Sequence, residues 1–499
     1  MSSGSPVLLS MSPQSLGWCK GNLSQVIEKK QVTGGTEQSH AKALIKNTGI
    51  FAIGTFGSKI LTLLIIPLCT HYIATDDMGA YDMVYTIIAL LQPIAVLAIP
   101  ESLFRWVIDA KADKKSVYST WLGLFVGLTA AFTAIFWICW LVVGFADAGL
   151  MYVLVVLSCL YQSFQYGTRG LHNNKLFAIS GIVYSIVYCL GCFLLVAVLN
   201  VGYHGLLYAM LAATIVASLF LVAPQRELRS FAASGIDGGV ALEMLRYSLF
   251  LLPNQLSWWA MTMLGRLIIV GFMGYSANGI FSVAMKFPSA LSMISNIFTP
   301  AWQEQAVMLF EKKGKDEYFS KVFNQYAILL VTLLIPGVPV TKLFVQLAMD
   351  SSYFSCFNYV ALLYLGAALN ALSAFAGVLY MCAKDTKGAA STTVIGAAVN
   401  IVVSLVLVPL TGLMGAALGN FLGNAAILVA RLRQTHKYCA MNVDWARIVT
   451  YGAIVVTVSF LAAALTSLVM VGALSLFCAI LFCFANRSSV KNLRGFLNK

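Results

Sequence analysis

Long apolar stretches of about 20 residues or more follow one another along most of the chain. A helix of that length crosses the roughly 30 Å hydrocarbon core of a membrane. The pattern predicts an all-α, polytopic membrane protein with about fourteen transmembrane helices, because a barrel would show short alternating segments instead. The predicted spans are 44–72, 79–105, 117–144, 149–169, 177–200, 204–223, 242–272, 277–307, 319–347, 356–382, 388–410, 413–432, 446–469 and 471–485.

Charge is sparse and asymmetric. The chain is 60% hydrophobic and 10% charged, which excludes a soluble globular protein. Nearly all lysines and arginines fall in the terminal segments or on one side of the predicted spans, and such residues collect in cytoplasmic loops. We therefore expect both termini in the cytoplasm. The net charge of +13 indicates topology and attraction to anionic membrane lipids, not nucleic-acid binding. The four exceptions to the charge rule are Lys59, Arg266, Lys286 and Lys342.

Signals of enzymatic chemistry do not appear in the sequence. The 11 cysteines are scattered, and the one close pair, Cys189 and Cys192, is typical of small packing residues on a membrane helix. The chain contains no Walker-type loop and no clustered metal ligands. We expect no cofactor, no metal, no catalytic residue and no enzymatic activity. The driving force of any transport would then be an ion gradient, the membrane potential or the substrate gradient.

Two halves of the chain repeat one plan. A shift of 200 residues aligns Gly79 with Gly279 and Pro100 with Pro300, and a shift of 210 aligns Gly202 with Gly412. An even number of spans separates the copies, so the repeats are parallel. The predicted organisation is two six-helix lobes and two C-terminal helices. Its parts are a disordered cytoplasmic tail (1–43), an N-lobe (44–224), an inter-lobe loop (225–241), a C-lobe (242–433), the last two helices (434–485) and a second cytoplasmic tail (486–499).

Polar residues form stripes on several predicted spans. A cation at the bilayer centre costs about 2.5 to 3.5 kcal/mol, so we expect the stripes to face a hydrated cavity between the lobes. Cations in such a cavity would attract an anion, and arginine forms paired hydrogen bonds to phosphate. Snorkelling, or pairing with an acid such as Asp82, is the alternative for each cation. The candidate substrate-binding residues are Lys59, Arg266, Lys286, Thr55, Thr62, Gln255, Trp259 and Thr262.

Acidic residues near helix ends are candidates for gating. Glu101 and Arg105 are four residues apart, a spacing that favours a structural ion pair at the cytoplasmic end of the second span. A latch that opens during transport is the second interpretation of this pair. Asp82, on the second span, and Glu304, at the related end of the eighth span, are further candidates for gating or ion pairing.

Three stretches resemble a known family. They are LIKNTGIFAIGTFGSKILTLLIIPLCTHYIATDDMGAYD at 44–82, PESLFRW at 100–106 and AAVNIVVSLVLVPLTGLMGAALGN at 397–420. The chain resembles bacterial polysaccharide-repeat flippases of the Wzx type, within the multidrug, oligosaccharidyl-lipid and polysaccharide exporter superfamily. Many relatives of the wider group have an acid just before the arginine of the seventh span, where this chain has Gly265. We therefore expect no local Asp–Arg pair there, which would leave Arg266 freer to bind substrate.

The resemblance implies a function in surface polysaccharide synthesis, such as lipopolysaccharide or capsule. The implied activity moves undecaprenyl-pyrophosphate-linked oligosaccharides from the cytoplasmic to the outer leaflet of the bacterial cytoplasmic membrane by alternating access. It implies a cationic cavity for the sugar and diphosphate, coupling to a H⁺ or Na⁺ gradient, and a polysaccharide polymerase as partner.

Other functions stay open at this point. A multidrug antiporter of the same superfamily would keep acids deep in its cavity, whereas here the deep charges are mostly cations. A flippase for the peptidoglycan lipid precursor or for a teichoic-type polymer would need similar phosphate chemistry. A polysaccharide polymerase or ligase would need a sizeable outer loop, which the sequence lacks. A membrane scaffold would leave the charged stripes unexplained.

Overall fold

The protein is almost entirely helical. The computed structural model describes residues 65–486, except 109–112, 227–234, 313 and 384, and these ranges contain no strand, which confirms the predicted all-α class. The helices are α3 (Thr75–Ala95), α4 (Ile99–Ile108), α5 (Lys114–Val143), α6 (Ala148–Gly170), α7 (Asn174–Cys192), the π-helix η1 (Phe193–Val198), α8 (Tyr203–Val222), α10 (Gly238–Ala284), α11 (Lys286–Leu309), α12 (Lys315–Ala348), the 3₁₀ helix η3 (Ser351–Cys356), α13 (Phe357–Ala383), α14 (Thr386–Thr411), α15 (Leu413–Thr435), α16 (Trp445–Ala464) and α17 (Leu468–Ala485).

The described helices include all of the predicted membrane spans except most of the first. Among the described residues, 12 helical segments are long and apolar enough to cross a membrane. One of them, Gly238–Leu309, covers 72 residues and contains two of the spans predicted from sequence. Most of the first predicted span, 44–72, lies outside the described residues. The count is therefore consistent with about fourteen spans, whereas the predicted domain boundaries stay predictions.

The predicted second span, 79–105, is two helices and not one. The helix α3 ends at Ala95 and α4 begins at Ile99. Between them, Leu97 and Ala98 have left-handed φ angles of 47° and 57°, which are unfavourable for residues with a Cβ. The break follows Pro93, whose ring removes a backbone donor from the helix and whose carbonyl accepts a hydrogen bond from Ala98.

The helix α10 is kinked at Gly274, between the predicted end of the seventh span at 272 and the predicted start of the eighth at 277. The helix α10 continues to Ala284, although Gly274 inside it has a non-helical conformation with φ 82°. Because glycine has no Cβ, it adopts this angle without steric cost. The helix α11 then begins at Lys286. The predicted eighth span, 277–307, is thus divided between the end of α10 and most of α11.

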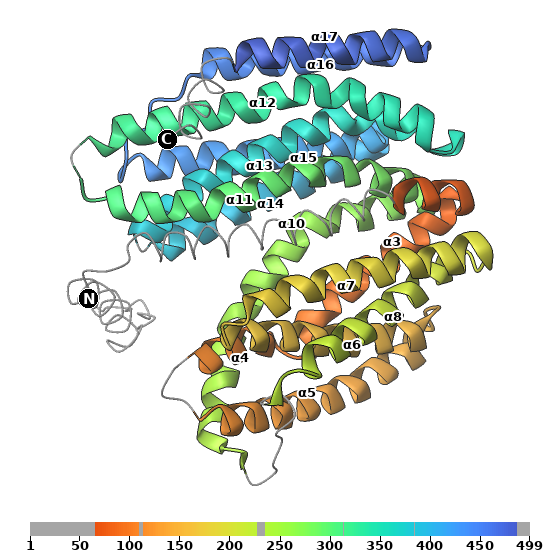
Figure 1. Cartoon of the computed structure of the whole chain (residues 1–499), viewed down its shortest axis with the longest axis vertical. Coiled ribbons are helices and arrows are strands. Elements are labelled where there is room, and N and C mark those ends of the chain that lie inside the picture. Colours follow the sequence, from red (N-terminus) through yellow and green to blue (C-terminus); the bar gives the residue numbers. More distant parts are fainter. Residues whose placement is uncertain (1–64, 109–112, 227–234, 313, 384, 487–499) are drawn as a thin grey trace, which may run out of the picture. The chain divides into compact units, whose positions relative to one another are not determined.

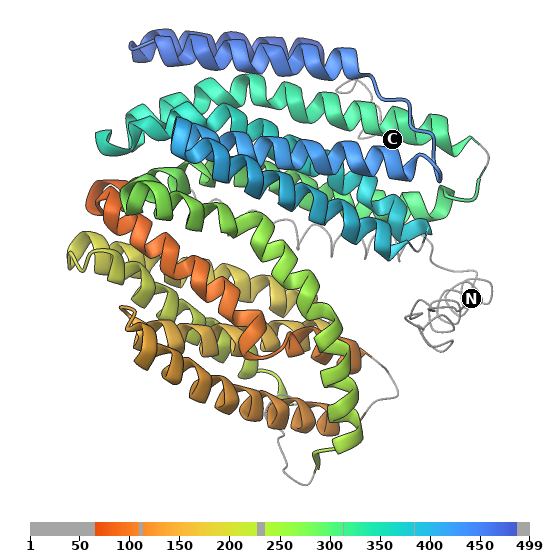
Figure 2. The ribbon, with the colours of Figure 1, turned by 180° about the vertical axis from the view of Figure 1, so that it is seen from behind.

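The helices pack in two groups joined by α10. In the first group α6 packs against α4 and α8, and α7 lies beside α8 (Figure 1). In the second group α15 packs against α13 and α14, while α16 and α17 pack on α12 (Figure 2). The long helix α10 packs along α3 of the first group and against α14 of the second. The last two helices are therefore attached to the second group.

A shared turn supports the internal repeat. Gly202 has φ 69° and ψ −150°, and Gly412, 210 positions later, has φ 64° and ψ −141°. The N–H of Gly205 donates to the carbonyl of Gly202 over 3.0 Å, and Gly415 donates to Gly412 over 2.9 Å. The turns at Gly202 and Gly412 therefore adopt the same conformation.

The two copies of the repeat meet where α3 crosses the end of α10. Gly79 and Gly279, which the repeat aligns, lie back to back. A Cβ on Gly79 would collide with the carbonyl of Tyr275, and a Cβ on Gly279 would collide with the carbonyl of Thr75. The hydroxyls of Thr75 and Ser276 are 2.6 Å apart beside them. Small residues let membrane helices approach closely, so these glycines fix the distance between the two helices.

The crossing can be tested with alanine. Gly79→Ala or Gly279→Ala should destabilise the protein by about 1–3 kcal/mol or more, because the added methyl group meets backbone atoms that cannot rotate away. Gly265→Ala on α10 is the control, since a Cβ there meets nothing within 4 Å. Thermal unfolding of the purified protein measures the effect. Unchanged midpoints for both crossing variants would contradict the close contact.

Candidate functional site

A buried ion pair joins α3 to α10 close to their crossing. Nε of Arg266 is 3.2 Å from Oδ2 of Asp82, and the side chains are 13% and 5% exposed, respectively. The amide of Asn278 donates to the same carboxylate oxygen over 3.2 Å and to the carbonyl of Gly79 over 3.1 Å. One carboxylate on α3 is therefore held by two donors from α10.

Further bonds tie the same faces of α3 and α10 together. Nη1 of Arg266 lies 3.4 Å from Oγ1 of Thr86 and 2.7 Å from Sδ of Met263. The indole N–H of Trp259 donates to the backbone carbonyl of Thr86 over 3.0 Å. Thr86 itself is fully buried. Trp259 and Arg266 thus form a polar seam along α3, the "α3 seam" below.

The electrostatics of the seam make it sensitive to loss of either charge. Opposite charges attract more strongly in a low-dielectric interior than in water. Removal of one partner leaves the other charge buried and uncompensated, which typically costs about 3–5 kcal/mol. The pairing of Arg266 with Asp82 is the alternative that the sequence left open. The expectation that Arg266 is freer to bind substrate is wrong for this conformation, because an acid on another helix takes the place of a local one.

Lys286 borders a cavity lined mainly by tyrosines. This "tyrosine cavity" has a volume of about 190 Å³, and Asp82 contributes to its wall. The hydroxyls of Tyr81 and Tyr188 are 3.0 Å apart. Lys286 stands at the start of α11, whereas the tyrosines come from α3 and α7. The remaining lining residues are Ile65, Tyr85, Tyr184, Ser185 and Met210.

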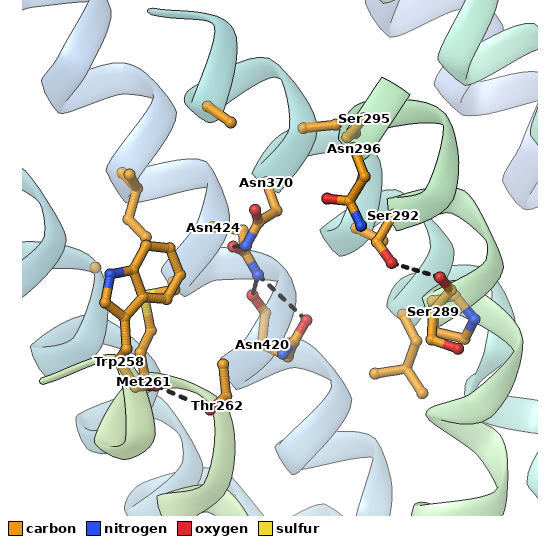
Figure 3. Close-up of a pocket in the computed structure, with 18 of the residues that line it drawn as sticks. Trp258, Met261, Thr262, Ser289, Ser292, Ser295, Asn296, Asn370, Asn420 and Asn424 are labelled. Atoms are coloured by element: carbon orange, nitrogen blue, oxygen red, sulfur yellow. Dashed lines mark hydrogen bonds between the residues drawn. The ribbon is translucent and has the colours of Figure 1, made fainter. Parts of the chain in front are cut away.

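A larger cavity lies among α10, α11, α13, α14 and α15. Its volume is about 550 Å³, and it is the "asparagine cavity" of the following sections. Thr262 lines it, together with Trp258 of the same helix. Figure 3 shows side-chain amides and hydroxyls from several helices gathered around this space. The amides in its wall are Asn296, Gln303, Asn370, Asn400, Asn420 and Asn424.

The predicted ion pair of Glu101 with Arg105 does not occur among the ion pairs of the described residues. The guanidinium of Arg105 lies 4.7 Å from the ring centroid of Tyr247, where cation–π attraction holds it. Glu101 lies beside Tyr166 and Gln255, and its Oε2 is buried without a hydrogen-bond partner. Helical spacing permits the pair, but contacts with α6 and α10 draw the two side chains apart.

Residues of the predicted polar face of α10 therefore lie against three different parts of the structure. Trp259 and Arg266 contact α3, Thr262 lines the asparagine cavity, and Gln255 lies beside Glu101. The gating candidate Glu304 is exposed near the end of α11. A gating role for Glu101, Arg105, Asp82 and Glu304 stays a prediction. The candidates Lys59, Thr55 and Thr62 lie outside the described residues.

Sequence reasoning missed several polar residues of these sites. Asn278, which is fully buried, was not singled out, although an amide inside a predicted span is an available signal. The amides of the asparagine cavity were missed as well. They are spread over four helices, so no local pattern connects them. Within the described ranges, no group of three or more His, Cys, Asp and Glu could hold a metal ion.

Comparison with solved structures identifies the fold. The structure is similar to the lipid II flippase MurJ in an inward closed conformation, with a TM-score of 0.63 and 12% identity over 88% of this chain and 99% of that one. An inward-facing multidrug resistance transporter of the MATE family, in the MOP superfamily, matches with a TM-score of 0.61 and 12% identity over 76% of this chain and 95% of that one. A mutant MATE transporter from Vibrio cholerae matches with a TM-score of 0.52 and 12% identity over 80% and 97% of the two chains. At such identities these likenesses show the fold alone.

Comparison of the sequence identifies the family. A search of curated proteins finds no significant match. A family model described as "Polysaccharide biosynthesis protein" matches residues 44–302, which is more than half of the 499 residues. The resemblance noted from sequence is confirmed at the level of family and fold. The chain therefore belongs to the family of polysaccharide biosynthesis proteins, built on the helical fold that MurJ and the MATE transporters share.

Proposed function

We propose that this protein is a flippase for lipid-linked oligosaccharides in surface polysaccharide synthesis. It moves undecaprenyl-pyrophosphate-linked repeat units from the cytoplasmic to the outer leaflet of a bacterial cytoplasmic membrane by alternating access, with both termini in the cytoplasm. The family description and the fold, which is similar to that of a lipid II flippase, support this proposal. No chemical step is needed, so the protein acts as a transporter and not as an enzyme.

The position of Lys286 is the observation that carries the proposal. Its ammonium-bearing side chain belongs to the second helical group, yet it borders a cavity whose other lining residues belong to the first. A cation at this place faces the contact between the repeats, where a substrate headgroup would pass. A diphosphate would gain charge-assisted hydrogen bonds from lysine and additional ones from the neighbouring tyrosine hydroxyls. Arg266 would join them once the α3 seam opens and its bond to Asp82 breaks.

The ion pair also bears on the competing antiporter. A cation-coupled multidrug antiporter needs an available acid in its cavity, but Asp82, the acid that borders the tyrosine cavity, already accepts from Arg266 and Asn278. This arrangement favours the flippase. A flippase for the peptidoglycan precursor or a teichoic-type polymer would use the same phosphate contacts, and the family description favours polysaccharide repeats over both.

The proposed transport also needs an energy source and a protein that receives the product. We expect coupling to a H⁺ or Na⁺ gradient and delivery of the product to a polysaccharide polymerase. Ionophores that collapse each gradient separately in reconstituted vesicles identify the coupling ion. A transport rate that stays the same after both gradients have been collapsed together would contradict ion coupling.

The role of Lys286 is testable in proteoliposomes with a fluorescent lipid-linked oligosaccharide. Lys286→Ala should slow translocation by about 10- to 100-fold, since a hydrogen bond to a charged group contributes about 1.5–3 kcal/mol. Lys342→Ala is the matched control, because Lys342 lies on a membrane helix with its ammonium 4.9 Å from the ring centroid of Phe357. A folded Lys286→Ala protein that transports at the wild-type rate would refute the phosphate-binding role.

The two roles of Arg266 can be separated. Arg266→Gln should destabilise the protein by about 3–5 kcal/mol, because Asp82 is left as a buried, unpaired charge. The double variant Asp82→Asn with Arg266→Gln should recover most of this stability, since no charge remains. If Arg266 also binds the diphosphate, the double variant stays slow in translocation. Unfolding midpoints and initial transport rates measure the two effects, and a stable double variant with full activity would disprove the second role.

A further inference from the structure

The asparagine cavity has a different chemistry from the rest of the candidate site. Among the described residues that line it, none carries a charge, whereas Asp82 and Lys286 border the tyrosine cavity. Its volume of about 550 Å³ lies within the roughly 300–1,000 Å³ range of pockets for small ligands. The helices α10, α11, α13, α14 and α15 form its walls, so it belongs to the second helical group.

A chain of amides fixes one wall of this cavity. Asn370 on α13 donates to the side-chain oxygen of Asn424 on α15 over 3.0 Å. Asn424 in turn donates to the backbone carbonyl of Asn420 over 2.8 Å. Each asparagine amide offers two N–H donors and an oxygen with two lone pairs. These bonds orient the amides and leave Asn370 and Asn420 with capacity for a ligand.

The opposite wall carries polar groups that the protein leaves exposed to the cavity. Figure 3 shows Asn296 and Ser292 across the space from the indole of Trp258, with Asn370, Asn420 and Asn424 between them. Trp258 is 45% exposed, and Asn296 is also exposed. Amides at membrane depth need hydrogen-bond partners, because an unsatisfied polar group in an apolar medium costs several kcal/mol. The cavity therefore suits a ligand that both donates and accepts many hydrogen bonds.

Uncharged sugars have this chemistry. Their hydroxyl and acetamido groups donate and accept, as asparagine amides do, and their C–H faces pack against aromatic rings. An acidic sugar would instead bring a carboxylate among described lining residues that include no cation, where desolvation of its charge is unfavourable. A cationic drug would find no acid among the lining residues that the structure describes.

We propose that the asparagine cavity is a binding site for uncharged sugar residues, held between Trp258 and the amides of α11, α13 and α15. For its physiological ligand this inference rests on the proposed flippase function: the cavity holds the sugar end of the repeat unit while Lys286 and Arg266 serve the diphosphate. The cavity thus selects repeat units whose bound sugars carry no charge.

Free trisaccharides test the site without the lipid. The full-length protein in nanodiscs is titrated with N,N′,N″-triacetylchitotriose and isomaltotriose, which are neutral, and with trigalacturonate, which is acidic. Binding is followed by saturation-transfer difference NMR. A neutral trisaccharide should give saturable binding and the acidic one should not. Asn296→Leu and Trp258→Ala should each weaken that binding at least tenfold. Asn254→Leu, an exposed asparagine of α10 outside the cavity lining, should leave it unchanged.

No saturable binding of either neutral sugar, equal binding of trigalacturonate, or wild-type affinity in both cavity variants overturns the sugar site. Unchanged unfolding midpoints in these variants show that lost binding is not lost folding. Lys286→Ala separates the two proposals, since it should retain sugar binding while losing transport of the lipid-linked substrate. Sugar binding without any transport by the wild-type protein would reject the flippase function and keep the sugar site.

Discussion

The ion pair of Arg266 with Asp82 is the interaction on which the contact between the two repeats depends. It lies beside the Gly79–Gly279 crossing, where the absence of side chains lets α3 and α10 approach closely enough for a buried guanidinium to reach a buried carboxylate. The pair is stable only while both partners stay together, because either charge alone is costly in the membrane interior. Close packing and charge pairing therefore support one another. Any movement that separates α3 from α10 must supply new partners for both charges, and a hydrated cavity or an anionic substrate would provide them.

The two copies of the repeat share one backbone turn but differ in the side chains that line their cavities. The hairpins at Gly202 and Gly412 share one conformation, yet the first helical group contains a cavity lined by tyrosines and the second one lined by asparagines. The repeated scaffold thus contains two cavities of different chemistry. This division suits an amphipathic substrate with a charged headgroup and a polar, uncharged extension. Lys286, at the junction of α10 and α11, is the cation that connects the first environment to the second helical group.

Sequence predicted the fold more fully than the site, for physical reasons. Membrane spans are readable because the bilayer demands long apolar helices, and the repeat is readable at glycines whose backbone angles exclude other residues. Side-chain direction is harder. Trp259 and Thr262 share a helical face, but one bonds to α3 and the other lines the asparagine cavity. The spacing of Glu101 and Arg105 predicted an ion pair. In the structure Arg105 instead contacts the ring of Tyr247, which is distant in sequence. The asparagines meet only after α11, α13, α14 and α15 have packed.

The proposed alternating access requires α3 to separate from α10 at the Gly79–Gly279 crossing during transport. A disulfide across it tests this most directly, because the hydroxyls of Thr75 and Ser276 are 2.6 Å apart. Thr75→Cys with Ser276→Cys is reconstituted in a background in which the exposed Cys139 and Cys483 are replaced by serine. Oxidation should stop translocation of a lipid-linked oligosaccharide and reduction should restore it, whereas neither single-cysteine variant should respond. Full translocation by completely cross-linked protein would show that the two helices do not separate during transport.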